Sequence, residues 1–372
     1  MDLKKYLSEL EFLVNIDSGS DNPSGQNQIA DFFEKGFSDI GWITKRYPND
    51  AIGDTLICVN READKYDLFL IGHIDTVFFK GEAQKRPFRT EGNFAYGPGV
   101  CDMKHGCLLM YYLMKELPEE INDKLNIVAV FNPDEETGSN RSKLAYAEYA
   151  QKSEYAFIYE ASGTNGARCI KRKGSCGVAA DFYGKAGHCG SVFTNGAKSA
   201  VSEMGKWIVA LDALQSRETE TTVNVGIAKG GTKRNIVADH AEIKVSIRYF
   251  DPNEVARVNK EIDRLTAEAE ERGIQVKLSR SSKLPLVPSE KALNYIKHLE
   301  EFTKSNGYDY TFDARGGLSD ANIISQFGAI CIDGMGPAGT KAHCDEEYML
   351  IDSVEPAFNY SNLLIKDIAD RK

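Results

Sequence analysis

Long hydrophobic runs are missing from this 372-residue sequence, and none approaches the roughly 20 residues that a transmembrane helix needs. We therefore expect no association with a membrane. Residues 1–14 carry charges throughout their apolar part, which predicts an amphipathic helix and not a signal peptide. Low-complexity segments and internal repeats are also absent, so the composition is that of an ordinary globular protein.

Paired cysteines and an excess of positive charge are lacking as well. The 8 cysteines show no C-x-x-C spacing, and without a signal peptide we expect them to be reduced in a cytoplasmic protein. Cys101 and Cys344 are adjacent to Asp102 and His343. They could sense oxidation or bind stray metal, but small hydrophobic filler is the favoured interpretation. The net charge of −10 argues against a nucleic-acid partner.

Among the residues that are present, the most informative are two adjacent acids at the end of an apolar run. Residues 126–131 form a run typical of a strand buried on both faces. Asp134, Glu135 and Glu136 follow it directly. Adjacent carboxylates repel each other, and a bound cation would remove that repulsion, leaving one to bind metal and one to handle protons. A solvated acidic turn is the competing interpretation.

A second apolar strand, residues 68–71, ends in Gly72 and His73, with Asp75 two residues further on. The Asp75 carboxylate can accept the second ring N–H of His73, which fixes the tautomer and raises the basicity of a metal ligand. A lone histidine is usually a satisfied structural residue, but the His-x-Asp pair at a strand end makes that interpretation less favourable.

Asp102 lies in a loop rich in glycine and proline, Tyr96–Gly106, and precedes an apolar segment, Cys107–Lys115, that predicts a core helix. Taken alone, Asp102 would be interpreted as the N-cap of that helix. Two further predicted strands, 155–159 and 329–332, lead to Glu160 and towards His343. All these groups fall at or just past the carboxyl ends of predicted parallel strands, where open α/β sheets place their sites.

Two histidines and several carboxylates suit Zn²⁺, and Co²⁺ or Mn²⁺ fit the same ligands. One zinc ion needs about three protein ligands plus water, whereas this chain offers five candidates. Two ions that share a bridging carboxylate would use all of them.

These motifs resemble the M20 family of co-catalytic zinc peptidases, which includes glutamate carboxypeptidases, aminoacylases, succinyl-diaminopimelate desuccinylases and peptidase T. Five blocks match in order along nearly the whole chain: Gly72–Asp75, Gly97–Lys104, Asp134–Gly138, Glu160–Gly163 and Ala342–His343. Five blocks in order, with family-like intervals, are much more specific than one.

The resemblance implies a role for each candidate. His73 and Glu160 would hold one metal ion, Glu136 and His343 the other, and Asp102 would bridge both. Glu135 would be the general base, with Asp75 orienting His73. Because several family members have a cis peptide after the bridging aspartate, we expect a cis Asp102–Met103 bond.

The expected fold is α/β, with a mostly parallel catalytic sheet and an inserted α+β domain. Residues 174–284 alternate in the order β-α-β-β-α-β, which predicts a ferredoxin-like arrangement. Residues 1–173 and 285–372 would then form the catalytic di-metal domain. The resemblance implies that the inserted domain serves as a lid and as the interface of a homodimer.

Three residues of the inserted domain resemble substrate contacts of the family. His188 matches the histidine that polarises the scissile carbonyl, often across the dimer, and Asn235 matches an asparagine that contacts substrate. Arg248 matches the arginine that takes the substrate carboxylate, for which a bidentate guanidinium is well suited. The competing interpretations are a surface histidine for His188 and a charged residue on the outer face of a strand for Arg248.

The predicted function is hydrolysis of an amide bond next to a C-terminal amino acid, in a small peptide or an N-acyl amino acid. Phe131–Ser139 and Gly316–Asp320 look closest to the glutamate-carboxypeptidase branch, which makes glutamate release one expectation. Glu160 is more usual in the aminoacylase and desuccinylase branches, so a deacylase or dipeptidase is the alternative. A non-catalytic amino-acid or peptide sensor is the remaining one, although such sensors usually lack a ligand or the base.

Overall fold

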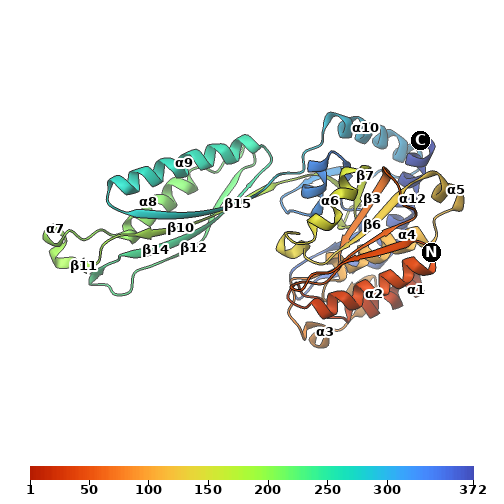
Figure 1. Ribbon diagram of the computed structural model, residues 1–372, viewed down its shortest axis with the longest axis horizontal. Coiled ribbons are helices and arrows are strands. Elements are labelled where there is room, and N and C mark those ends of the chain that lie inside the picture. The colour runs from red at the N-terminus through yellow and green to blue at the C-terminus, as the bar shows by residue number, and fades with distance from the viewer. The chain divides into compact units, whose positions relative to one another are not determined.

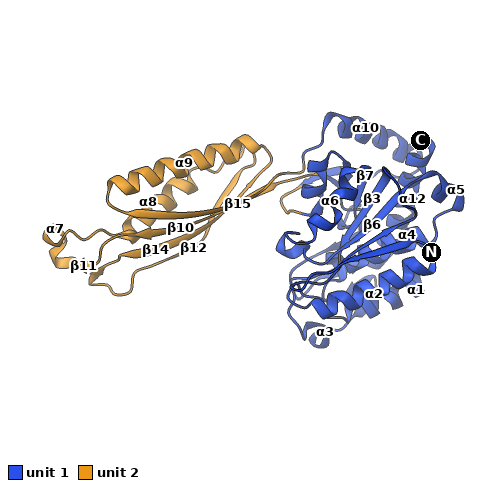
Figure 2. Cartoon of the chain, viewed as in Figure 1, with its two compact units in different colours: residues 1–170, 287–314, 319–372 blue, residues 171–286, 315–318 orange.

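The computed structural model describes residues 1–372, and the chain divides into two compact units (Figure 2). The first unit comprises Met1–Ile170, Val287–Ala314 and Ser319–Lys372, and the second comprises Lys171–Leu286 and Arg315–Leu318. The boundaries predicted at 173/174 and 284/285 lie within a few residues of these.

The short segment Arg315–Leu318 differs from the prediction, which assigned it to the catalytic domain. Its backbone carbonyls accept hydrogen bonds from Arg172 and Lys173, at the start of the second unit. The backbone N–H of Lys173 donates to the Arg315 carbonyl at 3.0 Å, and the Arg172 guanidinium donates to the carbonyls of Gly317 and Leu318 at 3.3 Å. No sequence periodicity indicates bonds of this kind, because they involve backbone acceptors.

The first unit is built on a six-stranded sheet in which four neighbouring strands, β6-β3-β7-β17, run parallel (Figure 1). Strands β1 and β2 extend it in antiparallel fashion. In sheet order the strands are β1 (Ile43–Tyr47), β2 (Thr55–Val59), β6 (Ile127–Asn132), β3 (Tyr66–His73), β7 (Ser153–Ile158) and β17 (Ile330–Ile332). The strands predicted near 68, 126, 155 and 329 are confirmed.

Helices cover both faces of this sheet, which explains why its central strands are apolar at nearly every position. One face packs against α1 (Leu3–Val14), α2 (Pro23–Asp39), α4 (His105–Lys115) and α12 (Val354–Arg371), and the other against α6 (Lys143–Gln151) and α11 (Asp320–Ile324). Helix α10 (Glu290–Ser305) contacts the edge strand β17, and α3 (Glu82–Lys85) and α5 (Glu119–Lys124) are short.

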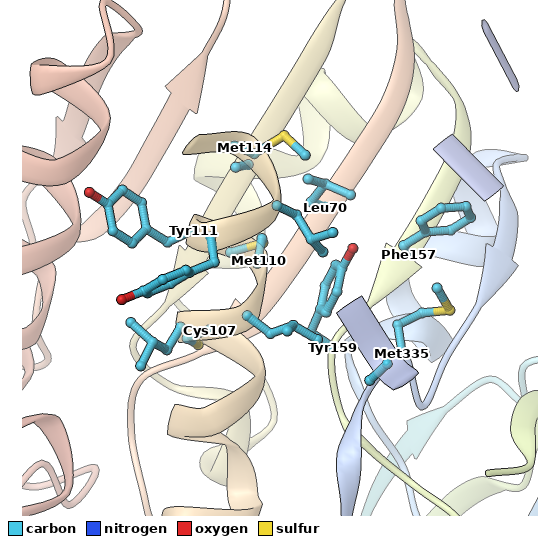
Figure 3. Close-up of a cluster of buried hydrophobic side chains, with 14 of the residues drawn as sticks. Leu70, Cys107, Met110, Tyr111, Met114, Phe157, Tyr159 and Met335 are labelled. Carbon is cyan, nitrogen blue, oxygen red and sulfur yellow. The ribbon is translucent and has the colours of Figure 1, made fainter. Parts of the chain in front are cut away.

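The main core lies between α4 and the sheet. Figure 3 shows Cys107, Met110 and Met114 of α4 near Leu70 of β3 and Phe157 of β7. The helix approaches the sheet so closely that a Cβ on Gly106 would lie 1.9 Å from the Tyr159 carbonyl oxygen. Only glycine fits there, and its lack of a side chain allows the start of α4 to lie directly against the chain that follows β7.

A second, five-stranded sheet in the first unit carries part of the site. Its order is β4 (Arg89–Glu91), β5 (Phe94–Tyr96), β19 (Tyr348–Leu350), β18 (Gly336–Thr340) and β8 (Ala161–Ser162). Strands β18 and β19 form an antiparallel hairpin. A short ribbon is formed by β9 (Arg168–Arg172) and β16 (Phe312–Arg315).

The second unit has the predicted β-α-β-β-α-β order and an antiparallel sheet in the order β12-β14-β10-β15, with its own core around Trp207 and Phe182. Its elements are β10 (Gly174–Tyr183), α8 (Ala200–Asp212), β12 (Thr222–Gly230), β14 (His240–Tyr249), α9 (Pro252–Glu271) and β15 (Gln275–Lys283). A small ribbon of β11 (Gly187–His188) and β13 (Ile236–Val237) and a short helix, α7 (Val192–Asn195), complete it.

The expected fold class, an α/β unit with a mostly parallel sheet plus a ferredoxin-like α+β unit, is thus confirmed. None of the helices combines the length and the apolar character that crossing a membrane requires.

Candidate metal centre

The five predicted ligands converge in the first unit as two overlapping groups. His73, Asp102 and Glu160 form one group, and Asp102, Glu136 and His343 form the other. Within each group the ligand atoms lie within 4.8 Å of one another. This spacing is compatible with a common ion in each group.

Asp102 is the residue that both groups share, and its two oxygens face in different directions. Oδ1 lies 2.9 Å from Nε2 of His73, whereas Oδ2 lies 3.1 Å from Nε2 of His343. His343 Nε2 is also 3.1 Å from Oε2 of Glu136, and His73 Nε2 is 3.8 Å from Oε1 of Glu160. A carboxylate with one oxygen directed into each group has the geometry of a bridge between two ions.

The donor set fits two divalent cations. With neutral imidazoles, its three carboxylates carry three negative charges in a largely buried place, which two divalent ions would more than neutralise. Oε1 of Glu136 is moreover buried without any hydrogen-bond partner, a costly condition that a bound cation would relieve.

The electrostatics of the ion-free cluster lead to the same conclusion. Burial alone would raise the pKa of Asp102, but hydrogen bonds from His343 and His73 outweigh it and hold that pKa well below its usual range. Hydrogen bonds to Asp102 and Glu136 raise the pKa of His343 to about 10. Protons therefore occupy the cluster when cations do not, and metal binding must displace them.

Four of the candidate ligands lie at the end of a strand, just after a strand or just before a helix. His73 ends β3, Glu136 lies in the turn η2 (Glu135–Thr137) after β6, Glu160 follows β7, and Asp102 lies in η1 (Val100–Lys104) before α4. Asp102 makes no capping bond to α4, so its interpretation as an N-cap is wrong. The expected cis peptide between Asp102 and Met103 is confirmed.

His343 differs from the expectation that all the ligands follow parallel strands. It lies in the turn of the antiparallel hairpin between β18 and β19, with a positive φ of 65°. Glycine-rich residues 336–340 form β18 without any of the alternating pattern that predicts a strand. The sequence identified this ligand only through its motif.

Asp75 holds more than His73, the one residue it was predicted to orient. The carboxylate is fully buried. Nδ1 of His73 lies 3.0 Å from the Asp75 backbone carbonyl and 3.3 Å from Oδ1 of the carboxylate. The same Oδ1 accepts the Glu135 N–H at 3.1 Å. The other carboxylate oxygen, Oδ2, accepts the Glu136 N–H at 3.2 Å and the Ser20 hydroxyl at 2.7 Å. One carboxylate thus orients a ligand and both acids of the Glu135–Glu136 pair.

Glu135 is partly buried, at the start of η2. Burial raises the pKa of its carboxyl well above the usual value, and the charges of Asp320 and Glu160 act in the same direction. A raised pKa near neutral pH suits a carboxyl group that first accepts a proton as a general base and later donates it as an acid.

Three residues of the site's surroundings were not predicted from sequence. Besides Ser20, the buried Asp320 accepts hydrogen bonds from Asn132 at 2.7 Å and Ser139 at 2.5 Å, which braces the turn that carries Glu135. Glu347 is 1% exposed and contacts the backbone of the Asp102 loop. The only sequence signal for Glu347 was its position four residues after His343.

The predicted substrate contacts all lie in the second unit. His188 in β11 is exposed and pairs through its backbone with Ile236, and the Asn235 carbonyl accepts the Cys189 N–H at 3.1 Å. These two residues are therefore neighbours. Arg248 in β14 pairs with Ser175, near the other end of the sheet, and its Nη1 is buried without a hydrogen-bond partner.

Comparison with known proteins identifies the class. A model of peptidase family M20/M25/M40 matches residues 69–367. The chain therefore belongs to this family, and it is an enzyme of the metallopeptidase and amidohydrolase class. The family resemblance inferred from the sequence motifs is confirmed.

Carboxypeptidase G2 from Pseudomonas sp. (strain RS-16) is 28% identical over 380 residues, covering 98% of this chain and 90% of that protein. Two solved structures show the same fold. A tripeptidase from Staphylococcus aureus has a TM-score of 0.84 at 23% identity and covers 100% of this chain and 99% of its own. Aminopeptidase PepT from Bacillus cereus has a TM-score of 0.83 at 20% identity, with 99% of both chains covered.

Proposed function

We propose that this protein is a two-metal amide hydrolase that releases a C-terminal amino acid from small peptides or N-acyl amino acids. The observation that carries the proposal is the Asp102 carboxylate, which directs one oxygen to His73 and the other to His343. A site for a single ion would not need a shared ligand with two histidines on opposite oxygens.

In this proposal His73 and Glu160 would hold one ion, Glu136 and His343 would hold the other, and Asp102 would serve both. Zinc is the favoured ion, and cobalt or manganese suits the same nitrogen and oxygen donors. When bound, two such ions polarise a substrate carbonyl and lower the pKa of water.

Glu135 is the residue that moves the proton. Its carboxylate takes a proton from the attacking water and delivers it to the nitrogen of the departing amine. Its backbone is held by Asp75, and burial raises its pKa. The backbone bond holds Glu135 in place. The raised pKa supports its role because a group that is too acidic could not accept the proton at neutral pH.

Arg248 binds the carboxylate of the departing amino acid, and His188 and Asn235 contact the scissile group. The free, buried Nη1 of Arg248 supports this assignment, since a substrate carboxylate would supply the missing acceptor. The distance along β14 from Arg248 to His240 is roughly 25 Å. His188 lies beyond the His240 end. The separation of His188 from Arg248 within one chain supports a homodimer through the second unit, in which His188 acts on the site of the other subunit.

Carboxypeptidase activity is favoured by the similarity to carboxypeptidase G2 along nearly the whole chain, and it makes glutamate-terminated substrates the first to test. Deacylation of N-acyl amino acids is the alternative, favoured by Glu160 in place of aspartate. In either case the second unit acts as a lid that completes the site, and the enzyme works in the cytoplasm.

The test is release of free amino acid by zinc- or cobalt-loaded protein from dipeptides, N-acetyl amino acids and peptides that end in glutamate. Glu135→Gln should lower kcat by at least about 10³-fold and leave two ions bound, while the exposed Glu120→Gln should change neither. Retention of activity by Glu135→Gln would refute the base assignment. Two bound ions with no turnover on any substrate would favour a sensor.

A further inference from the structure

Glu347 lies at the end of the turn between β18 and β19 that carries His343, yet its carboxylate contacts a different loop. Oε1 accepts the backbone N–H groups of Cys101 at 2.7 Å and Asp102 at 2.9 Å, and Oε2 accepts that of Gly99 at 3.0 Å. Three backbone amides of the Asp102 loop thus converge on one buried side chain.

The same residue is anchored in its own turn. The Glu347 backbone N–H donates to the Cys344 carbonyl at 3.2 Å, next to His343. Through a single side chain, the loop that carries the shared ligand Asp102 is therefore connected to the turn that carries His343. This connection crosses more than two hundred residues of sequence and depends on no regular secondary structure.

The backbone hydrogen bonds inside the loop involve other amides: the Val100 N–H donates to the Gly97 carbonyl at 3.1 Å, and the Lys104 N–H donates to the Gly99 carbonyl at 2.9 Å. Gly99 has a positive φ of 74°, and a Cβ there would lie 2.5 Å from Thr76 Cγ2, so the loop follows a narrow path. Amides that converge on one point cannot pair with backbone carbonyls in a helix or sheet, and an anionic acceptor satisfies them best.

The neighbouring acid provides a contrast. Glu346 is exposed and pairs with Lys341 inside the same turn. The two glutamates thus have the same charge and adjacent positions, but only Glu347 reaches the Asp102 loop. This pair separates the effect of removing a negative charge near the site from the effect of removing the connection.

We infer that Glu347 is a positioning residue that fixes Asp102 relative to His343, and that it thereby sets the affinity of one metal position more than that of the other. The inference rests on the proposed two-metal function. The Glu136–His343 group contains both connected ligands, whereas the His73–Glu160 group contains only Asp102. Loss of the connection displaces two ligands of the first group and one of the second.

The experiment compares Glu347→Gln with Glu346→Gln by calorimetric titration of the metal-free protein with zinc. An amide at position 347 keeps one acceptor oxygen and presents an NH₂ group to the remaining amides. Glu347→Gln should weaken the zinc step of the Glu136–His343 group by about 10–100-fold and the other step less, whereas Glu346→Gln should match the wild type. His343→Asn, which removes a ligand from one group only, identifies the step that belongs to that group.

A second measurement does not depend on metal. Hydrogen exchange of the amides of Gly99, Cys101 and Asp102 in the ion-free protein should accelerate in Glu347→Gln and remain unchanged in Glu346→Gln. If Glu347→Gln does not fold, Glu347→Asp keeps the charge on a shorter side chain and should show the same asymmetry in smaller measure.

Unchanged amide exchange, or equal weakening of both zinc steps, would overturn the inference. A wild-type protein that binds fewer than two ions would instead refute the proposed function. In that case accelerated exchange in Glu347→Gln would still support the connection between the two loops.

Discussion

Replacing Asp75 with asparagine is expected to weaken both metal binding and folding, although Asp75 contacts no ion in the proposed site. The carboxylate is fully buried and receives hydrogen bonds from Glu135, Glu136 and Ser20, with His73 close to the same oxygens. An asparagine keeps one acceptor oxygen and replaces the other with a donor.

Either orientation of the amide loses bonds. If the NH₂ group replaces Oδ2, the Ser20 hydroxyl can rotate and accept, but the Glu136 N–H faces a donor. If it replaces Oδ1, the Glu135 N–H faces a donor, and His73 Nδ1 keeps only the backbone carbonyl of residue 75 as an acceptor. An unpaired buried N–H costs about 1–3 kcal/mol, and the remaining bonds lose their charge assistance. The free energy of unfolding should therefore fall by about 2–4 kcal/mol.

Metal affinity should fall by about 10–100-fold, because the Asp75 carboxylate lies beside His73 and holds the backbone of Glu135 and Glu136. The assays are urea unfolding of the metal-free protein, zinc titration, and kcat/KM on the best substrate. Ser20→Ala removes a single hydroxyl from the same carboxylate and should cost only about 0.5–1.5 kcal/mol. If Asp75→Asn matched the wild type in zinc affinity and stability, Asp75 would not hold the site as argued here.

Two other predictions concern pH and packing. The pKa of His343 in the ion-free protein is raised from 6.5 to about 10 by hydrogen bonds to its two carboxylate neighbours. Its contribution to stability is then fully present below pH 6.5 and lost as the pH rises through about 10. Urea unfolding should show this decline in the ion-free wild type, and His343→Asn should lack it. Gly106→Ala should destabilise by about 1–3 kcal/mol because of the close Tyr159 carbonyl. Gly205→Ala, in the middle of α8 with open space around it, should stabilise by about 0.5–1 kcal/mol; equal effects of the two changes in thermal unfolding would refute the packing argument.

The sequence predicted the central strands because burial on both faces makes every position apolar, as in β3 and β6. It also predicted the ferredoxin-like order of the second unit, where alternation in β10 and helical spacing in α8 are clear. The five candidate metal ligands stood out because their motifs combine rare residue types with glycine at short distances.

The remaining features were not predictable for physical reasons. Strand β18 consists of Gly336–Thr340, whose small residues pair through the backbone and leave no side-chain pattern. Strand β15 pairs with β10 as far as Lys283, although its later residues are exposed and polar, so no apolar pattern marks that part of the strand. Glu347 and Ser20 act through hydrogen bonds to distant residues, and such bonds have no periodicity along the chain.

The boundary of the second unit has a consequence for how the protein is made. Arg172 and Leu286 exchange both backbone hydrogen bonds, each at 3.0 Å, so the main segment of this unit, Lys171–Leu286, begins and ends at one point. During synthesis from the N-terminus, the second unit is complete before β17, β18, β19 and α12 have been made. At this stage the first unit is incomplete: its sheet has an open edge and some of its core residues are exposed. Four of its five candidate ligands have been made. A nascent chain at this stage would contain only one full group of candidate ligands, and the second group would form only once the His343 hairpin has been made.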